Sequence, residues 1–358
     1  MDEQVCYFAG SGLITSIGGN SQTVLAAVRA SISGYQLSEY DDNQGRSISL
    51  ASVPQVLFDQ FDGELELGVK LSAQLDRTVK MAVLAARECF QGKNIHTPVP
   101  FILSLPEPID GICSPAPHIL IRNIIDVEKL PIDRDCVRQI AQGRAAGLMA
   151  LELAHKYLFE QGHDYVLVGA SQSYQHLPLL RYFYERERLL VEGGSGGVTL
   201  GEGACFILLC RSPDEAIVDN GKVVAIPVPS YAEEAGSIAS TDSAGKNMGE
   251  GLHNAVQKAL VAAPQNSISR LYSTMNGEAY WAKEHGVTAI RNQRKFKEGI
   301  VTEHPADCWG DLGCASGLAM IALSADTLLK SHNEQHHLVC ASSDREWRSA
   351  VHLHSRVI

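Results

Sequence analysis

Two apolar segments with similar beginnings lie almost half a chain length apart. They are RAAGLMALELA (144–154) and CASGLAMIALSA (314–325), and each carries two small residues, a glycine and a leucine near its start. Their glycines, Gly147 and Gly317, occupy comparable positions in a chain of 358 residues. Both segments are apolar on nearly every side of a helix, which is typical of central, buried helices. The repeat predicts two halves related by duplication, although small residues can also match by chance.

Aliphatic runs alternate with segments of helical periodicity along the chain. Five runs have the composition of buried parallel strands, and they cover residues 99–105, 164–170, 203–209, 222–228 and 337–342. Apolar residues recur at helical spacing in 75–90 and in 247–263. Strands that alternate with helices predict an α/β protein whose sheet is covered by helices on both faces.

Composition and charge exclude several classes of protein. The formal net charge is −11, and no basic stripe is present, which argues against a nucleic-acid partner. No apolar run reaches the roughly 20 residues of a membrane span, and the acidic opening MDEQVCYFAG does not resemble an export signal. The nine cysteines contain no CxxC pair. We therefore expect a cytoplasmic protein with reduced thiols and no membrane partner.

The densest group of histidines is SHNEQHH, which contains His332, His336 and His337. His332 and His336 are four residues apart, a spacing that metal ligands on a helix can have. The polar surroundings favour a solvated loop instead, and we expect no metal ion and no other cofactor.

Four segments resemble motifs of the β-ketoacyl (3-oxoacyl-ACP) synthases, which belong to the thiolase-fold superfamily. The segments are GSGLITSIGGNSQTVLAAVRASISGY (10–35), LDRTVKMAVLAARECF (75–90), LGEGACFILLC (200–210) and LGCASGLAMIAL (312–323). They occur in the order in which that family carries them. The resemblance implies a thiolase-like α/β fold with two pseudo-symmetric βαβαβ halves, 1–212 and 213–358, in an αβαβα layered arrangement. It also implies a homodimer in which the strand near 164–170 pairs across a two-fold axis.

The same resemblance implies that the active-site residues of the family are not retained. The nucleophilic cysteine of the family matches Arg144, or Ala145 if one residue is inserted, and neither side chain can attack a thioester. The first active-site histidine matches Asn276 and the second matches Gly310, with Asp311 beside it. The glycine-rich closing loop of the family is replaced by SDREWRS (343–349).

Arg144 raises a physical question, because a cation at a helix start opposes the helix dipole. A buried Arg144 would need an anionic partner, and Asp311 at the start of the matching helix is the candidate. The alternative is that Arg144 points to solvent and that Asp311 only caps its helix.

Three residues are weak candidates for a relocated catalytic group. Cys314 is interpreted mainly as a small core residue, because it is the counterpart of Arg144 in the repeat. Cys308 and Asn276 are the others, with water as the nucleophile beside Asn276. Glu284 and His285 beside Trp281 could form an acid/base site, but a solvated helix face is the simpler interpretation.

Two main hypotheses about function follow. The first is a non-catalytic adaptor, scaffold or partner subunit with a protein partner. Two sequence elements, NGE…KE and HPADCWGD…GCASG, are weakly similar to elements of synthase-like proteins found beside type VI secretion components. This similarity implies at most a helper role in the handling of secreted effectors. The second is a diverged acyltransferase that uses a relocated cysteine. A further alternative is a protein that binds acyl-CoA or acyl-carrier protein. A wide, open tunnel would favour the enzyme or the binding protein, whereas a plugged tunnel with an exposed apolar patch would favour the adaptor.

Overall fold

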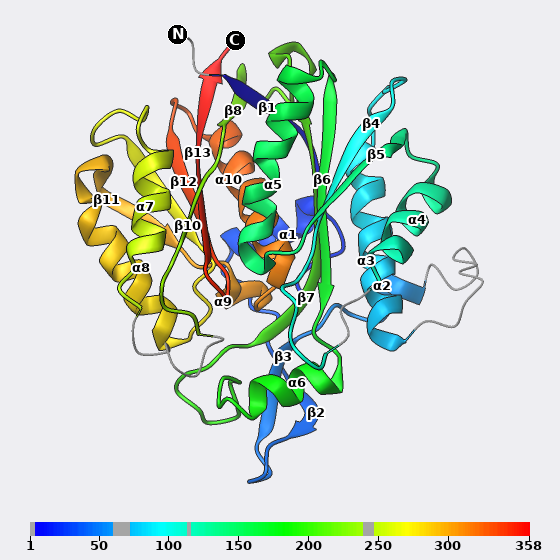
Figure 1. Cartoon of the computed structure of the whole chain (residues 1–358), viewed down its shortest axis with the longest axis vertical. Helices are drawn as coiled ribbons and strands as arrows, with labels where there is room; N and C mark the ends of the chain where they lie inside the picture. The colour runs from blue at the N-terminus through cyan, green and yellow to red at the C-terminus, as the bar shows by residue number, and fades with distance from the viewer. Residues whose placement is uncertain (1–3, 60–71, 113–115, 239–246) are drawn as a thin grey trace.

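The computed structural model describes residues 4–59, 72–112, 116–238 and 247–358 (Figure 1). Ten strands form the main path of one mixed sheet. Those of the first part are β1 (Val5–Thr15), β4 (Val99–Ser104), β5 (Ile132–Ile140), β6 (Tyr165–Ser173) and β7 (Leu200–Cys210). Those of the second part are β8 (Lys222–Pro227), β10 (Ile268–Ser273), β11 (Phe296–Glu303), β12 (His336–Ser342) and β13 (Trp347–Val357).

The two parts of the sheet have the same strand order. The first part is arranged β5-β4-β6-β7-β1 and the second β11-β10-β12-β13-β8, and antiparallel pairing of β1 with β8 joins them. Strand β7 in the first part and strand β13 in the second are antiparallel to both of their neighbours on this path. The remaining strand pairs within each part are parallel. Equal order and equal direction are what a duplicated chain is expected to have. The division at residue 212 falls between β7 and β8 and stays a prediction.

Helices cover both faces of the sheet and fill the space between its two parts (Figure 1). The α-helices are α1 (Ser21–Arg29), α2 (Val56–Asp59), α3 (Ala73–Phe90), α4 (Pro117–Glu128), α5 (Ala146–His155), α6 (Leu177–Tyr184), α7 (Glu250–Ala259), α8 (Ala279–Arg291), α9 (Ala306–Trp309) and α10 (Ser316–Lys330). Helices α3 and α4 pack on the outer side of the first part, and α7 and α8 on that of the second. Helices α5 and α10 share one hydrophobic core between the two parts. The predicted thiolase-like layering is therefore confirmed.

Shorter elements complete the fold. The strands are β2 (Gln36–Asp41), β3 (Ser47–Ala51) and β9 (Ser230–Glu233), and the helical turns are η1 (Gly143–Ala145), η2 (Lys156–Glu160), η3 (Pro213–Glu215), η4 (Gln293–Lys295) and η5 (Gly313–Ala315). The turns η1 and η5 lead directly into α5 and α10. No helix of the described residues is both long enough and apolar enough to span a membrane.

The repeated glycines allow the starts of α5 and α10 to approach each other closely. A Cβ atom on Gly147 would lie 2.8 Å from Leu318 Cγ, and one on Gly317 would lie 3.2 Å from the carbonyl oxygen of Arg144. Both helices are buried along most of their length, as their all-round apolar sequences predict. The repeat thus marks the contact between the two halves.

Two other motifs meet in a buried ion pair. Arg77, from the Asp-Arg pair on α3, donates hydrogen bonds from Nε to both carboxylate oxygens of Glu202, at 3.2 and 3.0 Å. Glu202 belongs to the Gly-Glu-Gly-Ala segment on β7 and is 1% exposed. Its carboxylate also accepts from Val53 N at 2.7 Å and from Ser173 Oγ at 2.6 Å. The carboxylate therefore has a structural role, because it is fully occupied in joining α3 to the sheet.

Two expectations about the strands are wrong. The aliphatic runs on β7 and β8 are antiparallel to their neighbours on the main path of the sheet, because antiparallel strands covered on both faces have the same continuous apolar pattern. The strand near 164–170 lies between β4 and β7, so it cannot pair with another chain. The strand at that edge of the sheet is β5.

We predict that Gly12→Ala destabilises the fold strongly. A Cβ atom at Gly12 would lie 1.8 Å from the carbonyl oxygen of Ala85, so β1 and α3 would have to separate. The expected loss in the free energy of unfolding is about 3 kcal/mol or more. Gly286→Ala on α8 is the matched control, because nothing lies within 4 Å of its new Cβ, and alanine favours a helix. Equal urea midpoints for the two variants would contradict this account.

Candidate functional site

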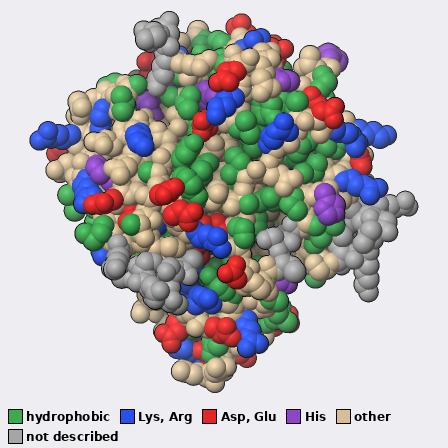
Figure 2. All heavy atoms as spheres, in the orientation of Figure 1, with side chains coloured by type: hydrophobic (Ala, Val, Ile, Leu, Met, Phe, Trp, Pro, Cys, Tyr) green, Lys and Arg blue, Asp and Glu red, His purple; other side chains and the backbone are tan. Residues whose placement is uncertain are grey.

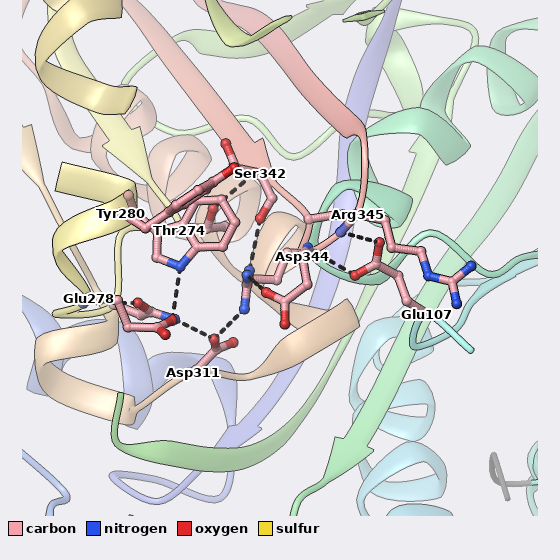
Figure 3. Close-up of polar contacts among 12 residues, drawn as sticks. Glu107, Thr274, Glu278, Tyr280, Asp311, Ser342, Asp344 and Arg345 are labelled. Carbon is pink, nitrogen blue, oxygen red and sulfur yellow. Dashed lines mark hydrogen bonds and ion pairs between the residues drawn. The ribbon is translucent and has the colours of Figure 1, made fainter. Parts of the chain in front are cut away.

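The four segments that the sequence resemblance aligns with the synthase active site bring Arg144, Asn276, Asp311 and Asp344 together in the fold. Arg144 is on η1, Asn276 follows β10, Asp311 precedes η5, and Asp344 lies between β12 and β13. Asp311, Asp344 and Glu278 point into one polar cluster (Figure 3). The site is built where the starts of the two central helices meet two loops that follow sheet strands.

Arg144 is buried in this cluster and paired with two carboxylates. Its side chain donates from Nη1 to Asp311 Oδ2 at 2.6 Å and from Nη2 to Asp344 Oδ1. Burial disfavours its charge, but the two carboxylates outweigh burial and hold the pKa of Arg144 above its usual value. The guanidinium carbon also lies 4.8 Å from the centre of the Trp281 ring. The expected Arg144–Asp311 pair is present, and the alternative of a solvated Arg144 is wrong.

A second arginine, which the sequence analysis missed, adds a second positive charge to the site. Arg188 donates to both oxygens of Glu278, at 2.6 and 2.9 Å, and to Asp344 Oδ2 at 2.6 Å. Burial raises the pKa of Asp344, but Arg188 and Arg144 together hold it well below its usual value. Arg188 lies in a loop after α6 that carries no motif, so no local signal could have identified it. We define the charge cluster as Arg144, Arg188, Glu278, Asp311 and Asp344.

Backbone donors at the starts of both central helices are already engaged. Ala145 N–H donates to Ser343 Oγ at 2.9 Å, and Cys314 N–H donates to Gln172 Oε1 at 2.8 Å. Helix-start donors of this kind can stabilise a thiolate or an oxyanion when they are free. Here each of these two donors has a side-chain partner instead.

The two candidate cysteines are poorly suited to nucleophilic attack. Cys314 is fully buried, its sulfur lies 3.9 Å from the carbonyl oxygen of Ser171, and burial raises its pKa to about 12. Cys308 on α9 is 9% exposed, and burial together with Asp307 raises its pKa. Nucleophilic cysteines have the opposite environment, which lowers the pKa and exposes the sulfur. The interpretation of Cys314 as a core residue agrees with its burial.

Asn276 and Gly310, which the sequence resemblance aligns with the two histidines of the family, are both in close contact with neighbouring residues of the fold. Asn276 is buried, donates to Asp311 Oδ2 at 2.8 Å and accepts from Glu278 N–H at 3.4 Å. Gly310 has a φ of 75°, and a Cβ atom there would lie 2.8 Å from that of Ala51. A histidine therefore does not fit at Gly310 without movement of the backbone.

The interpretation of Glu284 and His285 as a solvated helix face is wrong for Glu284. That carboxylate is 1% exposed and accepts from Arg348 Nε at 2.6 Å, and Arg348 is itself fully buried. His285 is half-buried, with its ring 5.1 Å from that of His304. Local polarity does not distinguish a solvated face from a buried ion pair, because the partner Arg348 lies far away in sequence.

A pocket of about 500 Å³ opens beside Arg144. Its lining includes Arg144, Gln172, Tyr174 and Gly313, together with side chains from 106–112 and 178–186. The described lining residues include no cysteine and no histidine. The pocket therefore remains open beside Arg144, while the side chain of Arg144 itself is paired with Asp311 and Asp344.

Glu107 lies on the wall of this pocket. It accepts from the backbone N–H groups of Asp344 and Arg345, at 2.9 and 3.0 Å (Figure 3). Burial, followed by the charge of Asp344, raises its pKa to about 6. The carboxyl group thus holds the β12–β13 loop against the pocket.

We predict that the Arg144–Asp311 pair is strongly coupled. Asp311→Asn leaves the buried guanidinium short of negative charge, so we expect a loss of about 3 kcal/mol in the free energy of unfolding. Arg144→Met removes the charge that needs neutralising. The loss in the free energy of unfolding of the double variant should therefore be smaller than the sum of the two single losses, by at least about 1 kcal/mol. Chemical denaturation of the four proteins measures this coupling, and additive losses would contradict it.

Comparison with models of protein families and with curated proteins finds no match for this chain. Solved structures do match. The ishigamide ketosynthase/chain length factor is 17% identical, with 98% of this chain and 99% of that chain covered and a TM-score of 0.68. The ketosynthase from module 6 of the bacillaene synthase of Bacillus subtilis 168 is 12% identical, with 98% and 72% covered and a TM-score of 0.75. A ketosynthase in complex with its chain length factor from Xenorhabdus doucetiae is 12% identical, with 98% of both chains covered and a TM-score of 0.69.

Identities this low establish the arrangement of the chain and not its chemistry. The similarity extends over nearly the whole chain in each comparison. The protein has the thiolase-like fold of the ketosynthases.

Proposed function

We propose that this protein is a ketosynthase-like subunit without condensing activity that acts by binding another protein chain. The charge cluster is the observation that carries the proposal. It contains a buried guanidinium, held by Asp311 and Asp344, and the sequence resemblance assigns this residue to the position of the nucleophile. An arginine paired in this way cannot attack a thioester.

The second support is the environment of the remaining candidate groups. Cys314 is buried with a raised pKa, and Asn276 uses its amide to hold Asp311. The helix-start donors Ala145 N–H and Cys314 N–H are occupied by side chains. A working thioester site would need a thiolate and free donors together.

The edge strand β5 is the surface that we assign to the partner chain. Apolar side chains of Cys136 and Ile140 on β5, Leu153 on α5 and Phe159 on η2 pack against the central core while staying partly exposed. Figure 2 shows hydrophobic side chains gathered where Figure 1 draws α5 and β5. An edge strand with an apolar neighbourhood is stabilised by pairing with another strand. One matching structure is described as a ketosynthase in complex with its chain length factor, which is a precedent for assembly with a second protein.

A second candidate function is reversible binding of an acyl group, because the pocket beside Arg144 stays open. Its wall carries Tyr182, Phe183 and Leu179, which supply apolar surface. Acyl-CoA or acyl-carrier protein would be the ligand in that case. The helper role in type VI secretion and the cytoplasmic location stay predictions.

We predict that a long-chain acyl-CoA forms no covalent adduct with the purified protein. Intact-mass measurement checks this, with Cys314→Ala and Cys308→Ala beside the unchanged protein. An adduct that either substitution removes would contradict the proposal. Reversible binding without an adduct, weakened by Tyr182→Ala, would instead support the second candidate.

We predict that two copies pair through β5 when no other partner is present. Cys136 is the middle residue of β5, so an antiparallel pair in which the two copies of β5 overlap completely brings the two Cys136 residues opposite each other. A short bismaleimide should therefore cross-link the dimer, and Cys136→Ser should abolish the product. Cys308→Ser is the control. A protein that is monomeric by light scattering, or cross-linked equally without Cys136, would contradict pairing of two copies through β5.

A further inference from the structure

Three histidines that do not belong to the charge cluster meet on one face of the sheet. His352 and His354 are two residues apart on β13, so they point to the same face. On β12, His336 is the register partner of His354, and Leu338 is that of His352. Leu338 belongs to the core under α7, so the three rings share the face that this helix covers. Strand pairing, rather than spacing within one segment, brings them together.

The ring nitrogens of these residues are close enough to share one ion. One nitrogen from each ring lies within 4.8 Å of the other two, and His336 Nδ1 is 2.9 Å from His352 Nε2. Nitrogens bound tetrahedrally to zinc, at 2.0–2.1 Å from the metal, are about 3.3 Å apart. The ring centres are separated by 5.1 to 5.5 Å. The rings are stacked, with interplanar angles of 14° to 25°, so they must turn about their side-chain bonds before all three nitrogens face one ion.

The hydrogen bonding of the cluster is incomplete in the part of the chain that the structure describes. The Nδ1 atoms of His352 and His354 are buried and have no hydrogen-bond partner there. Most buried polar atoms have a partner, so unpaired atoms of this kind call for an explanation. Neutral imidazole is the form that binds a metal ion.

We propose that His336, His352 and His354 form a binding site for a divalent transition-metal ion, with zinc as the best fit. Imidazole nitrogen is a preferred ligand of zinc, and three protein ligands leave a fourth position for water or another group. His336 is only half-buried, which gives an ion a route to the site. Among the His, Cys, Asp and Glu residues of the described chain, this is the group whose ligand atoms converge.

Arg356 is the competitor of the ion in this site. Its Nε donates to His354 Nε2 at 2.8 Å and occupies the lone pair on that atom. Lys295 and Lys297 add positive charge near His352 and His336, and Glu334 adds negative charge near His336. Arg356 is half-buried, so its side chain can turn toward solvent when the ion enters. Removing its charge should therefore strengthen metal binding.

Cobalt(II) titration of the chelator-treated full chain tests the proposal, because tetrahedral cobalt absorbs visible light far more strongly than octahedral cobalt. We expect one cobalt ion per chain with strong absorption, displaced by zinc. His352→Gln and His354→Gln should each weaken binding at least about tenfold. His332→Gln is the matched control, because His332 is exposed outside the cluster, and it should bind as the unchanged protein does. Arg356→Gln should bind more tightly.

Stability supplies an independent readout. Zinc that binds only the folded state should raise the Tm of the unchanged protein and of His332→Gln, but not that of His352→Gln. If the buried variants fail to fold by circular dichroism, His336→Asn at the half-buried position replaces them. The proposal is overturned if cobalt binding is absent or weakly absorbing, or if the folded cluster variants bind as His332→Gln does.

Discussion

A guanidinium buried at the start of a central helix has to be neutralised inside the protein, and much of the site follows from that requirement. Removing a charge from water costs several kcal/mol unless close partners compensate it. Arg144 finds its partners in Asp311, which precedes the matching helix of the other half, and in Asp344, from the β12–β13 loop. Asp344 in turn holds Arg188, which holds Glu278. The ion pairs therefore join both halves and two loops into one rigid site.

The charge cluster also breaks the symmetry that the duplication created. The two halves have the same strand order, and each central helix begins with a short turn and a closely packed glycine. One helix start carries Arg144 and the other carries Cys314. The backbone N–H of Ala145 at the first start and that of Cys314 at the second donate to different side chains. The thiol is a small core residue on one side, whereas the cation organises polar contacts on the other. A motif shared by the two halves thus has two different physical roles.

The surfaces outside the cluster divide between two further roles. The edge strand β5 and the neighbouring apolar side chains lie at one end of the sheet, and the three histidines lie on β12 and β13 in its other part. A partner chain on β5 would leave the histidine cluster accessible, because the strands β4, β6, β7, β1 and β8 separate the two places. The proposed protein pairing and the proposed metal binding therefore concern separate places in the fold.

The sequence by itself determined the elements and their duplication. Continuous apolar runs and helical periodicity depend on each segment's own neighbours, so β4, α3, α5 and α10 could be predicted from local patterns. The resemblance aligned Arg144, Asn276 and Gly310, with Asp311 beside it, with the active site, and the cost of a buried charge made Asp311 the candidate partner of Arg144. Only the tertiary structure decided which polar residues are buried together. Glu284 with Arg348, Arg188 with Glu278, and His336 with His352 and His354 are joined by strand pairing or by loops that meet in space. A local pattern contains no information about a partner that lies tens of residues away, so these contacts become visible only when the chain is folded.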